Sequence, residues 1–421
     1  MRKTVTIGDL GTIITGKTPP TTNKNYYGDY AVFIKPTDIS EQSKFTYETE
    51  EMYSKEAAEK YESSLVPKGA ICVPCIGTIG TKMTMTHCDC YTNQSINSIV
   101  CNDKYDNEYV YYLIKNFLPG LKAYNLGTAS GREYVSKSNF EKIELVAEQD
   151  KDAQIRIGKY LSRYDSLIEN YQRQIKLLEE AAQRLYKEWF VDLNFPGHES
   201  TKIDDGVPDK WDKKTLEDIC NLSKRVILPS DINEGCPYIG LEHMPRKDFC
   251  LSEWGHSEDI NSSKFEYKEG DILFGKIRPY FHKVGFAIND GYASTDSIIM
   301  QSKTGVWALL LMTVSSEQFV NYTSQTCKEG AKMPRADWNQ MKKYPVLIAS
   351  DTIQKEFERR CKLIANKIKT NALQIHFLTE ARDRLLPKLI SGEISVETAQ
   401  SVTSGLGVRK EHTGSPQATD S

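Results

Sequence analysis

The sequence predicts an α+β fold in which two similar globular domains each precede a long helix. Three observations carry this prediction: an internal repeat about 200 residues apart, a regular spacing of apolar side chains at the end of each copy, and short strand-like segments at matching places in both copies. A repeated unit of domain size favours two domains of one kind over one large domain.

Each copy ends in a stretch whose apolar side chains recur in alternating steps of four and three. The stretch covers residues 157–189 in the first copy and 357–389 in the second, and residues 168–185 share eight of eighteen positions with 368–385. This spacing forms an a/d seam, which buries its stripe against another helix. We therefore expect the two helices to pair, with packing of each stripe on its own domain as the alternative.

Two polar residues, Asn371 and Arg382, interrupt the second stripe. A polar residue in such a seam can define register and orientation at some cost in stability. They indicate a defined partner for the helix rather than a general apolar face.

The repeat extends into the segments before the helices. Residues 69–73 resemble 270–274, and residues 91–96 resemble 292–297, both at an offset of 201. Between these segments the two copies differ almost completely. The sequence thus predicts two scaffolds of one kind that carry different surfaces.

Domain boundaries follow from the repeat and from composition. The last stretch is rich in Ser, Thr, Gly and Gln, a composition too polar to bury a core, so we expect disorder there. The expected segments are a first domain at 1–150, a first long helix at 151–193, a linker at 194–210, a second domain at 211–350, a second long helix at 351–391 and a disordered tail at 392–421.

Within the domains, glycine turns, apolar runs and capping residues predict the individual elements. Ser138 begins a segment with the spacing of a capping box, and Asp337 is its expected counterpart as an N-cap. Strands are expected at 31–34, 70–74, 237–240 and 271–274, and helices at 109–117 and 306–314, the last of which could instead be a buried strand.

Composition narrows the class of protein. The chain has 421 residues, 39% of them hydrophobic, and this content suffices to form two hydrophobic cores. The sequence has no apolar run long enough to span a bilayer. The polar start after Met1 does not resemble a signal peptide. The ten cysteines lack the spacing of a disulfide framework, which favours a reducing compartment. We expect a cytoplasmic protein.

The chain lacks the motifs of common catalysts. It contains no phosphate-binding loop, no dinucleotide-binding glycine motif, no nucleophile elbow, no zinc-protease motif and no Asn-Pro-Pro-aromatic tetrad of an amino-methyltransferase. Cys72, Cys75, Cys88 and Cys90, with His87, have types and spacing that zinc could use. Buried thiols acting as small apolar groups are the commoner case, so we predict no metal site.

Basic clusters near turns suggest an anionic partner. They lie at residues 274–283, 328–335 and 127–132, the last two just before predicted helices. Backbone amides at a helix start with Arg or Lys beside them suit a phosphate, and Arg or Lys can read guanine in a major groove. The alternative for each cluster is a solvated turn with ordinary surface charge.

The net charge of −3 is low for a protein that binds DNA alone, because phosphate neutralisation supplies most of that affinity. We therefore expect DNA binding only within a larger complex. The candidate DNA contacts are Lys82 and Arg132 in the first domain and Lys276, Arg278, Lys283, Lys332 and Arg335 in the second.

The second copy contains several motifs in a fixed order: Gly206 to Trp211, Gly270 to Phe274 followed by Lys276 to Pro279, Ser294 to Asp296, and Arg384 to Ile394. In this order the motifs resemble those of the specificity subunit of Type I restriction-modification systems. The first copy lacks the opening Gly-x-x-Pro-x-x-Trp and has Ile76 to Gly80 in place of the Lys-Ile-Arg-Pro element.

The resemblance implies two target recognition domains, each reading one half of a split, asymmetric DNA target. It also implies that the two helices pair antiparallel as a spacer; a helix over 153–189 would be roughly 55 Å long, against roughly 34 Å per turn of B-DNA. Catalysis would then belong to partners. These are modification subunits, two in number, that use S-adenosylmethionine to methylate adenine, and a restriction subunit that requires ATP and Mg.

Charged residues expected on the outer helix faces are candidates for docking the modification subunits, although such charges are usually just solvated. Two rival functions remain open. One is a coiled-coil adaptor without DNA contact, and the other is a nuclease using acids such as Asp204, Asp205 and Asp209, a stretch that reads better as a linker. The docking candidates are Glu169, Arg173, Glu179, Glu180 and Lys187.

Overall fold

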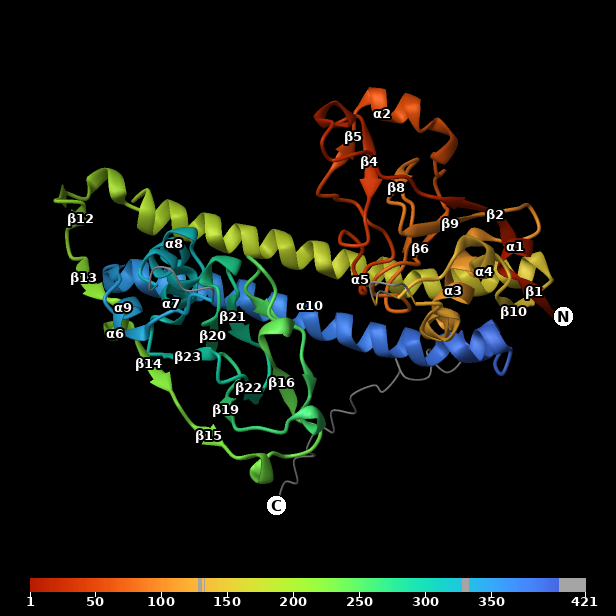
Figure 1. Cartoon of the computed structure of the whole chain (residues 1–421). Coiled ribbons are helices and arrows are strands. Elements are labelled where there is room, and N and C mark those ends of the chain that lie inside the picture. The colour runs from red at the N-terminus through yellow and green to blue at the C-terminus, as the bar shows by residue number, and fades with distance from the viewer. Residues whose placement is uncertain (128–130, 132, 328–332, 401–421) are drawn as a thin grey trace, which may run out of the picture. The chain divides into compact units, whose positions relative to one another are not determined.

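The computed structural model of the chain describes residues 1–127, 131, 133–327 and 333–400. It divides into two compact units, one formed by Met1–Glu169 with Phe377–Ser421 and the other by Asn170–His376. Each unit contains one α+β domain and a segment of each long helix (Figure 1). The expected fold class of two α+β domains, each followed by a long helix, is confirmed.

The domain of the first unit contains two small sheets. One has the strand order β2-β9-β6-β7 and the other β3-β5-β4-β8, while β1 pairs antiparallel with β10. The elements are β1 (Arg2–Thr6), α1 (Ile7–Leu10), β2 (Gly11–Thr15), β3 (Tyr27–Gly28), β4 (Ala31–Ile34), β5 (Met52–Tyr53), α2 (Lys55–Lys60), β6 (Ile71–Pro74), β7 (Thr84–Met85), β8 (Tyr91–Thr92), β9 (Ile96–Cys101), α3 (Asn107–Phe117), α4 (Lys137–Glu141) and β10 (Glu144–Glu148).

The domain of the second unit repeats this plan. Its sheets have the orders β14-β23-β20-β21-β17 and β15-β19-β22-β16-β18, and β13 pairs with β24. The elements are β11 (Ile203–Asp204), β12 (Val207–Pro208), β13 (Asp212–Thr215), α6 (Leu216–Ile219), β14 (Cys220–Ser223), β15 (Val226–Ile227), β16 (Pro237–Ile239), η7 (Leu241–His243), β17 (Cys250–Leu251), β18 (Gly255–His256), β19 (Lys264–Tyr267), β20 (Ile272–Gly275), η9 (Pro279–Phe281), β21 (Val284–Ala287), β22 (Gly291–Ala293), β23 (Ser297–Ser302), α7 (Trp307–Val314), α8 (Glu317–Gln325), α9 (Trp338–Met341) and β24 (Pro345–Ile348).

The strand registers show that the internal repeat is structural. Ile71 of β6 lies opposite Ile99 of β9, and Ile272 of β20 lies opposite Met300 of β23, at the offset of 201 found in the sequence. In all four strands the first four residues are buried, including the polar side chains of Asn97 and Ser98 in β9. The two domains therefore share one scaffold.

Local capping explains where the short helices begin. Asp337 caps α9 by accepting the backbone N–H of Asn339 at 2.9 Å, as predicted. The predicted cap at Ser138 is wrong, because the hydroxyl of Ser136 accepts the N–H of Asn139 at 3.2 Å and α4 already starts at Lys137. The segment α7 is a helix and not a strand, and all but its first residue are buried.

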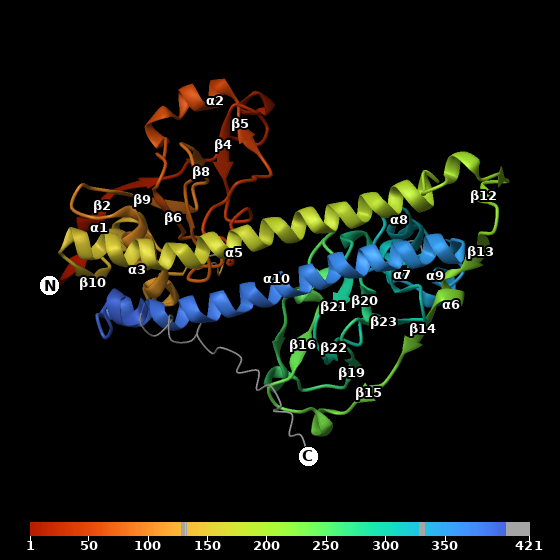
Figure 2. The same ribbon diagram turned by 180° about the vertical axis from the view of Figure 1, so that it is seen from behind.

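The long helices are α5 (Lys151–Tyr186), which continues into a π-helical turn at Lys187–Val191, and α10 (Asp351–Ser391). In the second unit they run antiparallel: Gln174 contacts Asn371, and Trp189 packs on Phe357 with ring centroids 5.9 Å apart. In the first unit the two helices meet at a buried ion pair between Asp165 and Arg382. Both views show the two helices side by side (Figure 2).

Residues 392–400 do not form the disordered tail that composition predicted. Gly392 turns the chain with φ +80°, and Val396 and Ala399 beyond it are buried in the core of the first unit. Two small apolar side chains at helical spacing suffice for this packing, although the stretch is polar on average. The remainder of the expected tail lies outside the described residues.

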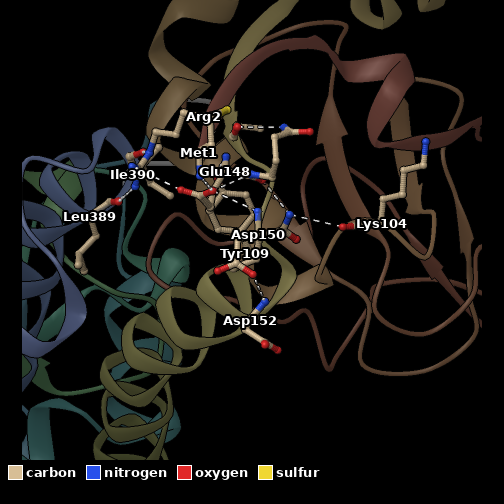
Figure 3. A network of polar contacts seen from close by, with 12 residues as sticks. Met1, Arg2, Lys104, Tyr109, Glu148, Asp150, Asp152, Leu389 and Ile390 are labelled. Atoms are coloured by element: carbon tan, nitrogen blue, oxygen red, sulfur yellow. Dashed lines mark hydrogen bonds and ion pairs between the residues drawn. The ribbon is translucent and has the colours of Figure 1, made fainter.

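A polar network joins both ends of the first unit (Figure 3). The Arg2 guanidinium donates hydrogen bonds to the carbonyls of Leu389 and Ile390 at 3.1 and 2.8 Å, where the last turns of α10 leave carbonyls without helical partners. The buried carboxylate of Glu148 accepts the amino group of Met1 at 2.5 Å. Strand β1 is thereby connected to β10 and to the end of α10.

No helix among the described residues combines the length and the apolar character that crossing a membrane requires.

Candidate nucleic-acid interface

Two basic segments of the second domain, far apart in the sequence, meet in the structure. Ile277 forms an isolated antiparallel bridge with Arg335, flanked by two backbone hydrogen bonds. Arg278 N–H donates to the carbonyl of Pro334, and Ala336 N–H donates to the carbonyl of Lys276, both at 2.8 Å. This loop crossing, defined as residues 276–278 paired with 334–336, gathers the predicted cations Lys276, Arg278 and Arg335.

Beside the loop crossing lies a cleft of about 620 Å³. Its lining includes the cations Lys224, Lys276 and Arg335, one acid, Asp337, and the aromatic side chains of Phe265 and Trp338. The Lys276 ammonium donates to the carbonyl of Thr295 at 2.6 Å and lies 5.4 Å from the centre of the Phe265 ring. A cleft with several cations and an apolar wall suits a phosphate together with its sugar.

Neighbouring charges affect the cations of the cleft. Burial lowers the pKa of Lys276, and the positive charges of Arg335 and Lys224 lower it further, while Asp296 opposes this. Arg335 forms an ion pair with Asp296, with 2.8 Å between Nη1 and Oδ1. Because more positive than negative charge faces the cleft, a bound anion would stabilise the ammonium form of Lys276.

On the other side of the crossing, Arg278 lies beside the Phe281 ring. Its guanidinium carbon is 5.7 Å from the ring centre, and that of Arg246 is 4.2 Å from the same centre. Tyr280, which is 54% exposed, packs edge-on against Phe281 with ring centroids 5.0 Å apart. We call these four residues the arginine-aromatic patch; it offers guanidinium donors and flat ring faces to a ligand.

The loop that carries the patch is anchored by a buried histidine. His282 Nε2 lies 2.8 Å from the carbonyl of Ser315, so this nitrogen carries the proton and donates. Burial lowers the pKa of His282, and the ring therefore stays neutral near pH 7. The backbone carbonyl of His282 accepts a hydrogen bond from the N–H of Lys247 at 3.0 Å. This bond joins the loop of Arg246 to that of Phe281.

The other predicted cations are placed differently. The Lys283 ammonium donates to the carbonyl of Leu241, and burial lowers its pKa. Lys82 is half-buried in the loop between β6 and β7 of the first domain. Arg132 and Lys332 lie outside the described residues.

The first domain has the same loop crossing with other side chains. Ile76 bridges Tyr134, Gly77 N–H donates to the carbonyl of Glu133 at 3.0 Å, and Val135 N–H donates to the carbonyl of Cys75 at 2.8 Å. The backbone is thus repeated, whereas the positions of Lys276, Arg278 and Arg335 are held by Cys75, Gly77 and Tyr134.

Sequence reasoning missed Lys224 and Arg246. Neither lies in a basic run near a helix start, and Lys224 is far along the chain from both Lys276 and Arg335, the cations it joins. In the structure Lys224 directly follows β14 and Arg246 lies between η7 and β17, elements that the sequence analysis did not predict. Only the pairing of these loops places them beside Lys276 and Phe281.

The prediction that Glu179 lies on an outer helix face, available to dock a partner, is wrong. Glu179 is 4% exposed and accepts backbone N–H groups of Phe249 and Cys250 at 3.0 and 2.8 Å, so it faces the second domain and not solvent. Burial, with the charge of Asp248 second, raises its pKa to about 8. The sequence analysis placed Glu179 on the outer face of the helix. In the structure, β17 and the residue before it cover that side of α5.

The other docking candidates remain at the surface or near it. Arg173 and Glu180 are exposed, and exposed Lys187 pairs with Asp192 at 2.5 Å. Glu169 is half-buried and accepts the hydroxyl of Tyr47 at 3.2 Å within the first unit.

Three cysteines of the predicted cluster, Cys72, Cys75 and Cys90, are buried, and Cys88 is half-buried. Cys72 is completely buried beside the Ser98 hydroxyl at 3.3 Å, and burial raises the pKa of Cys72 and of Cys75 to about 12. Among the described residues, no group of three or more His, Cys, Asp or Glu side chains is placed to hold a metal ion. The thiols act as small apolar groups in the core.

Comparisons with known proteins give one consistent family. The model of the Type I restriction modification DNA specificity domain matches residues 2–180. The chain is 26% identical over 414 residues to the Type I restriction enzyme MjaIX specificity subunit of Methanocaldococcus jannaschii, with 93% of each chain covered. It is 35% identical over 167 residues to the HindI specificity subunit of Haemophilus influenzae, which covers 39% of this chain and 36% of that protein.

The fold comparison agrees over nearly the whole chain. The crystal structure of the Type I restriction-modification system S subunit from M. genitalium superposes with a TM-score of 0.57 at 16% sequence identity, covering 93% of this chain and 96% of the other. At this identity the likeness concerns the fold: two α+β domains and their long helices.

Proposed function

We infer that this chain belongs to the Type I restriction-modification specificity subunits and is the subunit that recognises the DNA sequence. The observation that carries this inference is the match of the specificity-domain model to residues 2–180, together with the second copy of the same scaffold at residues 211–350. The resemblance seen in the sequence motifs is confirmed by the relatives. A coiled-coil adaptor without DNA contact is not favoured.

Each domain reads one half of a bipartite, gapped and asymmetric target. Two similar scaffolds with different loop-crossing side chains support this reading, since different side chains read different base edges. The paired helices act as the spacer between the half-sites. The proposed DNA contacts are Lys276, Arg278, Lys283, Lys332 and Arg335 in the second domain and Lys82 and Arg132 in the first.

The chain is a non-catalytic subunit, and its partners supply the chemistry. It assembles with other restriction-modification subunits and with DNA. We propose two modification subunits, which use S-adenosylmethionine to methylate adenine, and a restriction subunit that uses ATP and Mg. The exposed side chains of Arg173, Glu180 and Lys187 are the remaining docking candidates on α5 and the turn after it.

Methylation mapping tests this function directly. The chain is co-expressed with its candidate modification subunit, and methylated adenines are located across host DNA by single-molecule sequencing. We expect one bipartite, gapped motif that disappears when this chain is omitted. A stable complex that methylates no such motif would support the adaptor function instead.

A further inference from the structure

We propose that the second domain divides its cations between two tasks: Arg278, positioned by Phe281 and Arg246, reads a base edge, whereas Lys224, Lys276 and Arg335 hold a backbone phosphate in the neighbouring cleft. This proposal rests on the proposed function and deepens it. It names Lys224 and Arg246 as DNA-interface residues that the sequence motifs do not indicate.

The backbone at Arg278 is the first argument. Its φ is +51°, in the left-handed region, whereas the first domain has Gly77 with φ +94° at the corresponding position. Glycine adopts such a φ freely, but a residue with a side chain is strained there. An arginine at this position is therefore explained better by what its side chain does than by the needs of the fold.

The side chain of Arg278 is incompletely satisfied. Within the described part of the chain, its buried Nε atom has no hydrogen-bond partner. Buried donors almost always have an acceptor, so an orphan donor indicates a missing one. A guanine presents two acceptors, O6 and N7, that match the fork of an arginine.

The surroundings of Arg278 hold it in place instead of neutralising it. Its guanidinium lies beside the Phe281 ring, and Arg246 lies beside the same ring. Two further residues of this loop pair, Lys247 and His282, have positive φ values of 70° and 54°. Strained backbone persists only where the surrounding contacts determine it, so the patch is preorganised and Arg246 is a positioning residue.

The cations of the cleft are suited to a different task. Lys276 already donates to the carbonyl of Thr295, and Arg335 already pairs with Asp296. A lysine acts as a point charge, and an arginine held by an acid keeps only part of its fork free. Such groups attract a phosphate without distinguishing bases. Leu222, Ile298 and Trp338 line the same cleft and provide an apolar wall for the sugar.

The test uses the complex of the full chain with its modification subunit. Dissociation constants are measured by fluorescence anisotropy for the mapped target, for every single-base variant of both half-sites and over a range of salt concentrations. Arg278→Ala should lower affinity for the target about tenfold or more and abolish preference at one position of one half-site. Arg278→Gly should cause the same losses of affinity and base preference. Because glycine fits the left-handed backbone, these losses could not then be due to misfolding.

The cleft variants should behave differently. Lys276→Ala and Lys224→Ala should each weaken binding uniformly across sequences, and the slope of log affinity against log salt should fall by about 0.9. Arg246→Ala should reduce preference at the Arg278 position only, and should have no further effect when Arg278 is already alanine. This non-additivity distinguishes positioning from a general loss of structure.

Arg359→Ala is the matched control, since Arg359 is exposed on α10 and held by Glu356; it should change nothing. Equal weakening of all sequences by Arg278→Ala, or relaxed preference on Lys276→Ala, would overturn the assignment. Failure of the proposed function itself looks different, because the unmodified complex would then show no sequence preference at all.

Discussion

The loop crossings of the two domains have nearly identical backbones and unlike side chains. Cys75 and Lys276 each donate a backbone N–H to the residue 20 positions later at 2.7 Å, and each accepts an N–H from the paired loop at 2.8 Å. The side chains differ in charge and size: the thiol of Cys75 corresponds to the ammonium of Lys276, and Tyr134 corresponds to Arg335. The same backbone hydrogen bonds maintain both crossings, so the side chains at these positions can change without loss of the scaffold.

The helix seam offers a second comparison between the units. In the first unit the seam buries the ion pair of Asp165 and Arg382, and Asp165 also accepts the hydroxyl of Tyr112. In the second unit it buries Asn371, whose amide donates to Gln174 at 3.1 Å. The polar pair of the first seam is therefore charged, whereas the pair of the second seam is neutral.

The largest effect is expected from breaking the buried ion pair. Arg382→Ala leaves the carboxylate of Asp165 buried without its cation, so the free energy of unfolding should fall by about 3–5 kcal/mol. Urea unfolding measures this. Arg384→Ala is the control, because that exposed residue forms a surface pair with Glu380 worth about 0.5 kcal/mol or less. Equal losses for the two variants would mean that the ion pair has no special role.

The comparison of Arg278 with Gly77 predicts that replacing Arg278 by glycine reduces DNA discrimination but leaves stability nearly unchanged. Arg278→Gly removes the left-handed strain but adds backbone freedom to the unfolded chain, so the free energy of unfolding should stay within about 1 kcal/mol. Discrimination at one base pair should nevertheless fall by about 1–3 kcal/mol. Thermal unfolding and competition binding on variant targets measure the two effects. A strongly destabilised variant would instead make Arg278 a structural residue.

Glu179 should make the second unit sensitive to pH. Burial raises its pKa to about 8 in the folded state, against about 4.3 unfolded. Between these values the folded chain holds a proton that the unfolded chain lacks, so stability is lost as pH rises. From pH 5.5 to pH 8, unmodified protein should lose on the order of 2 kcal/mol more than Glu179→Gln.

Urea unfolding at both pH values measures this difference. Glu180→Gln, its exposed neighbour, is the control and should follow the unmodified protein. The corresponding residue of α10 is Thr379, 200 positions later, which does not titrate. Parallel pH dependences for Glu179→Gln and the unmodified protein would contradict the prediction.

The smallest effect is expected at the amide of the second seam. Asn371 is fully buried and its Oδ1 has no hydrogen-bond partner among the described residues. Asn371→Leu should therefore raise the free energy of unfolding by up to about 1 kcal/mol, since an unpaired acceptor is replaced by an apolar group. Thermal unfolding measures it. A loss of several kcal/mol would show that the bond to Gln174 is essential.

Much of the fold could be predicted because its signals are local. The seam periodicity, the strand at residues 70–74 and the cap at Asp337 each depend on neighbours within one element, and the structure contains all three. The cap at Ser138 was wrong by two residues because Ser136 offers the same hydroxyl two residues earlier. Order at residues 392–400 was missed because two buried side chains outweigh a polar average.

The candidate site was only partly predictable. Lys276, Arg278 and Arg335 were found from their basic runs, and the crossing of the two loops brings them together. Lys224 and Arg246 carried no comparable signal, and Glu179 looked like a solvated charge. Which side of a helix is covered depends on a distant strand, which helical spacing alone does not indicate.

The sequence by itself determined the duplicated α+β scaffold and the helix seam, and its motifs indicated the family resemblance, since these depend on periodicity and on motifs read along the chain. Only the tertiary structure decided which cations share a cleft, that Arg278 has a left-handed backbone where the first copy has glycine, and that Glu179 is buried. These properties arise from contacts between segments tens of residues apart, and no local pattern specifies such contacts.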